Sequence, residues 1–149
     1  MAGNAMDMLT AVDQGGRPLA DFALEYREQI PLERNATVSV TGDGRVVVVV
    51  SSLKQNCKQH WDSHCWQTNT VQQRIGEEKL RALVNLFAVS DIGALPYEIE
   101  APPGAAYFSS EVLVGGDVVL RAAGSMSHLE QSPLLLKLRQ LLAGFLQQK

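Results

Sequence analysis

The chain has 149 residues, a length typical of one domain, and hydrophobic residues make up 46% of it. It carries 13 Lys and Arg against 16 Asp and Glu, a formal net charge of −3 at pH 7. Because nucleic-acid-binding surfaces concentrate positive charge, this balance argues against a nucleic acid partner. No stretch approaches the roughly 20 apolar residues of a membrane-spanning helix, so no membrane span is expected.

The first residues of the chain lack the pattern of a secretory leader. They have neither a basic start followed by an apolar run nor a small-residue cleavage site. Glycine and proline are scattered among small residues, which is typical of a mobile terminus. The sequence therefore predicts a flexible N-terminal tail over residues 1–20 and one domain over residues 21–149.

Several segments have the residue patterns of β-strands: alternating polar and apolar residues, or runs of β-branched residues. They are residues 22–27, 36–40, 45–51, 67–75, 107–114 and 117–122. Asp43-Gly44 and Gly115-Gly116 supply the tight turns of two hairpins, because these residues tolerate positive φ angles. The five consecutive valines at 46–50 favour an internal strand that is covered on one or both faces.

A first helix is expected over residues 76–90, where apolar residues recur at i, i+3, i+4 and i+7. These residues are Leu80, Leu83, Val84 and Phe87. Glu77 and Glu78 precede them, and negative charge is favourable in a first helical turn. Asp91, Gly93 and Pro96 then end the helix.

A second helix is expected over residues 133–147, with Ser132 as its N-cap and Pro133 as its first residue. Its apolar side chains fall within an arc of about 100 degrees and should pack on the sheet. They are Leu134, Leu138, Leu141, Leu142 and Phe145. Leu136 falls outside the arc and is expected to be exposed or to contact a partner.

These elements do not alternate as strand and helix at a fixed spacing, which disfavours a parallel doubly wound sheet. The expected fold class is α+β. The sheet should be antiparallel, with about four to five strands and two helices packed on one face.

The densest cluster of reactive side chains is Cys57, His60, His64 and Cys65, between two predicted strands. Their spacing offers four ligands to zinc, although the loop is compact and lacks separated knuckles. A disulfide between Cys57 and Cys65 is a second interpretation, because paired strands bring Cα atoms near the required distance of about 5.5 Å. The third interpretation is a pair of unlinked thiols beside solvated histidines.

An enzymatic interpretation would make the protein a cysteine- or zinc-dependent hydrolase using the same four residues. A cysteine nucleophile also needs an activated thiolate, a group that orients the base and an oxyanion site, and no motif supplies them. We therefore expect no catalytic residue, no cofactor and no metal. Acidic residues outnumber basic ones between positions 98 and 130, where Glu111 and Asp117 accompany Arg121.

The leading functional hypothesis is a non-enzymatic protein-binding module. Its surface would comprise the 53–66 loop and the 96–106 connection, because long irregular segments in compact domains usually carry function. Trp61 is the expected anchor, since exposed aromatic residues are frequent at interfaces. The candidate binding residues are His60, Trp61, His64, Tyr97, Glu98 and Glu100.

Four segments also resemble a family: "TGDGRVVVV", "LRALVNLFAVSDIGALP", "AAYFSSEVLVGG" and the Leu-rich C-terminus. Their layout is similar to that of small bacterial domains that include the emfourin-type inhibitors of thermolysin-like metalloproteases, and it covers most of residues 22–148. The resemblance implies a small binding domain and, as its function, protease inhibition. No inhibitory residue carries over position by position.

Two further properties stay open at this point. One alternative function is that of a structural or oligomeric subunit, which Leu136 and the valine run favour. The chain is expected to be a monomer or a weak homo-oligomer. Localisation is not determined by the sequence. A real disulfide together with a removed leader would indicate a periplasmic or secreted protein.

Overall fold

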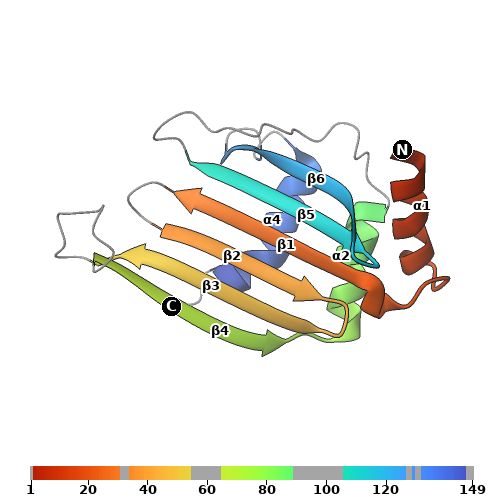
Figure 1. Ribbon diagram of the computed structural model, residues 1–149, viewed down its shortest axis with the longest axis horizontal. Helices are drawn as coiled ribbons and strands as arrows, with labels where there is room; N and C mark the ends of the chain where they lie inside the picture. Colours follow the sequence, from red (N-terminus) through yellow and green to blue (C-terminus); the bar gives the residue numbers. More distant parts are fainter. Residues whose placement is uncertain are drawn as a thin grey trace.

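The computed structural model describes residues 2–30, 34–54, 65–88, 106–126, 129 and 132–146. Within them, an antiparallel sheet of order β4-β3-β2-β1-β5-β6 forms one layer and helices form the other (Figure 1). The strands are β1 (Phe22–Ile30), β2 (Arg34–Thr41), β3 (Arg45–Leu53), β4 (Trp66–Arg74), β5 (Tyr107–Val114) and β6 (Asp117–Ser125). The helices are α1 (Ala2–Asp13), α2 (Glu77–Ala88) and α4 (Pro133–Leu146), with the short 3-10 turn η1 (Leu19–Asp21).

The α+β class and the antiparallel sheet are therefore confirmed. The expected sheet of about four to five strands is too small, because every segment with a strand pattern joins a single six-stranded sheet. The expected pair of helices is also incomplete, since the described residues include α1 as a third.

β1 to β4 form a meander, and β1 also pairs with β5 from the distant C-terminal half. The turn between β2 and β3 closes as its residues predict. Asp43 accepts hydrogen bonds from the Thr41 hydroxyl and the Arg45 amide, which hold the pKa of the Asp43 carboxyl below its ordinary value. Gly44 adopts a φ of 90°, which glycine reaches without strain.

One face of the sheet packs against the helices and forms the core. Strand residues alternate between the two faces, so every second side chain of β1, β2, β3 and β5 enters this core. Its largest strand contributors are Phe22, Leu24, Tyr26, Val38, Val48, Phe108 and Val112. The valine run follows the same rule: Val46 and Val48 are buried, whereas Val47 and Val49 are half-buried on the opposite face.

The opposite face of the sheet carries no described helix, and we call it the open face (Figure 1). Polar and small side chains from all six strands make up most of it. The register aligns them in rows across the sheet, such as Thr70, Val49, Thr37, Arg27, Ser109 and Ala123. Because the helices cover the other face, the open face is the part of the described sheet that a partner could contact.

The N-terminal segment, expected to be a flexible tail over residues 1–20, contains a helix. Residues 2–13 form α1, which packs against α2 and β6 at one end of the sheet. Leu9 and Val12 are almost fully buried there, and Asn85 of α2 donates hydrogen bonds to Asp13. These two apolar side chains lie one helical turn apart, so α1 packs through one side of the helix.

The predicted stripe of α2 is confirmed, and that of α4 is confirmed in part. Leu141 is only partly buried, the Phe145 side chain lies outside the described residues, and Leu135, which falls outside the predicted arc, is fully buried. Leu80, Leu83, Val84 and Phe87 of α2 are buried, as are Leu134, Leu138 and Leu142 of α4. Leu136 is 37% exposed, as its position outside the arc predicts. None of the helices in the described ranges is long and apolar enough to cross a membrane.

Candidate functional site

All six candidate binding residues lie outside the described residues, as does Cys57 of the predicted disulfide. The six are His60, Trp61, His64, Tyr97, Glu98 and Glu100. Cys65 is described: it immediately precedes β4, is 2% exposed and is disulfide-bonded. Cys57 is the only other cysteine in the sequence, and its pairing with Cys65 stays a prediction.

The disulfide state of Cys65 bears on the zinc and hydrolase interpretations. Both require a thiolate, because the thiolate is the metal ligand and the nucleophile. A sulfur in a disulfide bond has no thiolate to offer. The described residues also contain no group of three or more His, Cys, Asp and Glu side chains that could hold a metal ion.

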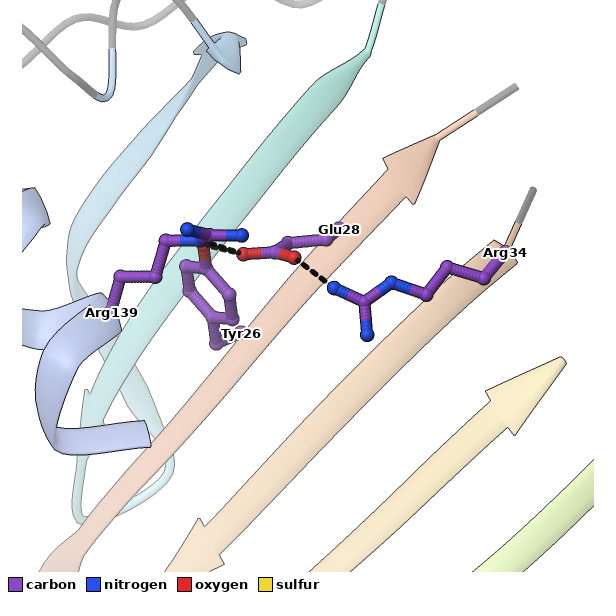
Figure 2. A network of polar contacts seen from close by, with 4 residues as sticks. All are labelled: Tyr26, Glu28, Arg34 and Arg139. Atoms are coloured by element: carbon purple, nitrogen blue, oxygen red, sulfur yellow. Dashed lines mark hydrogen bonds and ion pairs between the residues drawn. The ribbon is translucent and has the colours of Figure 1, made fainter. Parts of the chain in front are cut away.

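The described chain does contain a buried charged network, at the end of β1 (Figure 2). Glu28 is fully buried, and three side chains donate hydrogen bonds to its carboxylate. Tyr26 donates its hydroxyl to Oε2 at 2.6 Å, and Arg139 of α4 donates Nε to the same oxygen at 2.8 Å. Arg34 of β2 donates Nη2 to Oε1 at 3.2 Å. The network thus ties α4 to two strands.

The pKa shifts in this network are consistent with a structural role, in which the network holds α4 against the sheet. Burial, followed by the hydrogen bond to Glu28 and its charge, raises the pKa of Tyr26 far above the ordinary value, so the phenol stays protonated. The hydrogen bond to Glu28 also raises the pKa of Arg139. With three donors on its carboxylate, Glu28 links β1, β2 and α4.

The sequence pattern of β1 contains a signal for part of this network. The alternation of Phe22, Leu24 and Tyr26 on the buried face places Glu28 on that face too. A carboxylate in such a position needs a partner, because a buried unpaired charge is very unfavourable. The identity of Arg139 as that partner depends on the packing of α4, 111 positions away.

A second cluster of charged residues lies on the open face, around a recess of about 220 Å³ over β1, β5 and β6. Small residues, Ser109 and Ala123, lie side by side among its lining residues. Around them are Glu25, Arg27, Tyr107, Glu111 and Arg121. We call these seven residues the recess.

The four charged side chains of the recess form two neighbouring ion pairs. Glu25 and Glu111 lie directly opposite each other on β1 and β5, where like charges are unfavourable by themselves. Each is paired with an arginine: Arg27 contacts Glu25, and Arg121 donates Nε to Glu111 at 2.9 Å. The recess therefore presents two carboxylates between two guanidinium groups.

This arrangement can recognise polar groups of either sign. The guanidinium groups can donate to a carboxylate or a main-chain carbonyl, and the carboxylates can accept from ammonium or amide groups. Tyr107 adds an aromatic side chain with a polar tip. In the sequence, Glu111 and Arg121 stand out only as members of an acidic segment, since their neighbours on β1 come from a distant part of the chain.

Comparisons with known proteins add no family assignment. No protein-family model matches the sequence, and no curated protein matches it. The likeness to emfourin-type domains consequently contributes only to a proposal.

Proposed function

We propose that the protein is a non-enzymatic protein-binding module that contacts its partner through the recess on the open face. The observation that carries this proposal is the pair of exposed Arg–Glu contacts around small central residues. Arginine and tyrosine are enriched at protein interfaces and often dominate their binding energy. A recess between them gives a partner's side chain a place to insert.

The same ion pairs contribute little to the fold, which favours a role in recognition. The arginine side chains of the two pairs are 55% and 53% exposed. Exposed ion pairs typically stabilise a protein by less than about 1 kcal/mol. Four charged residues on three adjacent strands are therefore better accounted for by a partner than by folding stability.

Protease inhibition is the more specific form of this proposal. It is supported by the resemblance to emfourin-type domains and by an open face that a protease could approach. Under this proposal the chain acts as a protein ligand of a thermolysin-like metalloprotease, without chemistry of its own.

The test compares Arg121→Ala with Arg81→Ala. Arg81 is a matched control, because it forms an exposed ion pair with Glu77 on α2, in the helical layer. Wild type is immobilised and exposed to an extract of its native host, and the affinity of each captured protein is then measured. We expect Arg121→Ala to weaken binding at least about tenfold, a loss typical of a dominant interface residue. Arg81→Ala should bind as wild type does.

Two results would count against the proposal in different ways. Equal binding by wild type and Arg121→Ala would show that the recess is not the contact surface. A peptide-hydrolysis assay with a thermolysin-like metalloprotease tests inhibition separately. Undiminished hydrolysis at high concentrations of wild type would rule out this target class while leaving the binding experiment to decide on the recess.

A further inference from the structure

The sheet has two edges within the described residues, β4 and β6, and they differ in how they limit pairing with another strand. An edge strand carries main-chain N–H and C=O groups that no neighbouring strand uses, so it can pair with a further strand. Proteins commonly block such pairing with bulges, charges, prolines or a covering element.

The β6 edge carries several of these features. Its register with β5 shifts between Val112 and Leu113, where one residue of β6 bulges out of the ladder. Asp117 and Arg121 place charges along the strand, and α1 packs against it. This edge is therefore protected against a further strand.

Among the described residues, the β4 edge has fewer of these features. Its nine residues pair with β3 in an uninterrupted register, from Arg45 opposite Arg74 to Leu53 opposite Trp66. Residues 66–73 contain neither a charged residue nor a proline. β4 is also open to solvent on both faces, since four consecutive side chains are exposed: Gln67, Thr68, Asn69 and Thr70. Such a strand is held mainly by its single neighbour.

The orientation of the main-chain groups of β4 follows from two hydrogen bonds at its ends. Lys54 N donates to Cys65 O at 2.8 Å, and Ile75 N donates to Gly44 O at 2.9 Å. Cys65 and Ile75 thus direct main-chain groups toward β3, and in an antiparallel strand this direction alternates from residue to residue. Accordingly, the N–H and C=O groups of Thr68, Thr70 and Gln72 point away from β3.

We propose that β4 pairs with β4 of a second copy of this chain, antiparallel and with the two-fold axis at Thr70. This register uses the whole length of the strand. Each outward-facing residue then meets another outward-facing residue, so their main-chain groups exchange hydrogen bonds. The two sheets become one continuous sheet, and the open faces lie on the same side.

The side chains of β4 favour a second copy as the occupant. In this register, Thr70 lies opposite Thr70 of the partner subunit, and Thr68 lies opposite Gln72 of the partner subunit. Cross-strand pairs of hydroxyl and amide side chains are favourable. Arg74, the only charged residue of β4, lies opposite the partner's Trp66, where a cation–π contact replaces repulsion between like charges. This surface is separate from the recess, and the proposal is independent of the proposed function.

Disulfide trapping tests the register directly. Cα atoms of a hydrogen-bonded antiparallel pair lie about 5.5 Å apart, within the range of a disulfide. Thr70→Cys should therefore form an intermolecular disulfide when incubated with oxidised glutathione. Thr68→Cys is the matched control, because the two copies of position 68 are four residues out of register, about 13 Å apart. Mass spectrometry of the linked peptides verifies the site.

Molecular mass in solution tests whether the unmodified protein associates. Wild type should run at twice the monomer mass of 16.2 kDa in light scattering at high micromolar concentration. Thr70→Pro should run as a monomer, because it removes an N–H that points away from β3 and so leaves the β3–β4 ladder intact. Thr70→Val keeps this N–H and should remain a dimer.

The proposal is overturned if wild type is monomeric at these concentrations. It is equally overturned if Thr68→Cys crosslinks as readily as Thr70→Cys, or if Thr70→Pro is folded by circular dichroism and still dimeric.

Discussion

Glu28 links the helical layer to the sheet through hydrogen bonds to its buried carboxylate. It connects a strand in the middle of the sheet to Arg34 on its neighbour and to Arg139 on α4. A buried carboxylate with three donors is stabilising only while its partners remain, since removing one side of such a pair leaves a charge without compensation.

We predict that Glu28→Gln lowers the free energy of unfolding by about 2 to 4 kcal/mol, because it removes charged hydrogen bonds from a buried site. Glu111→Gln is the matched control and should cost less than about 1 kcal/mol, because its pair with Arg121 is exposed. Urea unfolding of both variants measures the difference. Equal losses would show that Glu28 is no more important to stability than a surface carboxylate.

The raised pKa of Tyr26 predicts that the protein loses stability at alkaline pH. Its pKa is raised in the folded state, mainly by burial, whereas in the unfolded chain it is about 10. Above that pH the unfolded chain loses the proton and the folded protein keeps it, so wild type loses stability as the pH rises further. Below it, both states are protonated and the contribution is constant.

Tyr26→Phe should therefore cost about 1 to 2 kcal/mol at neutral pH, from the lost hydrogen bond to Glu28. The difference between variant and wild type should shrink as the pH rises beyond about 10. Urea unfolding at a series of pH values follows it, and the ionisation of the other tyrosines cancels in the comparison. A difference that stays constant across this range would contradict the buried, protonated state of Tyr26.

At the scale of single elements, α4 allows a comparison within one helix. Leu138 is fully buried and Leu136 is 37% exposed, two positions away. We predict that Leu138→Ala costs about 2 to 5 kcal/mol, as expected for a large side chain removed from a core, and that Leu136→Ala costs less than about 0.5 kcal/mol. Thermal and urea unfolding check both values. Similar costs would mean that the helix presents a different face to the sheet.

The helices also show what a sequence can predict about an element. α2 and α4 were predictable because their apolar residues recur with the helical period over more than two turns. α1 was not, because its sequence shows no such recurrence; among its described side chains, Leu9 and Val12 are the buried ones. Its stability comes from packing against α2 and β6, a tertiary contact that periodicity does not encode.

For the whole molecule, the strand segments were predictable and their order was not. Alternation and runs of β-branched residues located the strands of the described residues, and hairpin turns predicted the β2–β3 and β5–β6 pairs. The placement of β5 beside β1 depends on long-range packing, and both charged clusters depend on that placement or on the docking of α4. Consequently the strands that carry the recess residues could be predicted from the sequence, but the placement of these strands side by side could not.

The pairing of β1 with β5 also has a consequence for synthesis of the protein. β2 directly follows β1 in the chain, yet the partner for the other edge of β1, β5, is translated much later. At typical rates of chain elongation, roughly 5 to 15 seconds pass between residue 30 and residue 114. During this interval, β5 and α4 are not yet available to cover Phe22, Leu24 and Tyr26, which are buried in the finished fold. Early binding by a chaperone at β1 would protect the chain at the stage when it is most prone to aggregate.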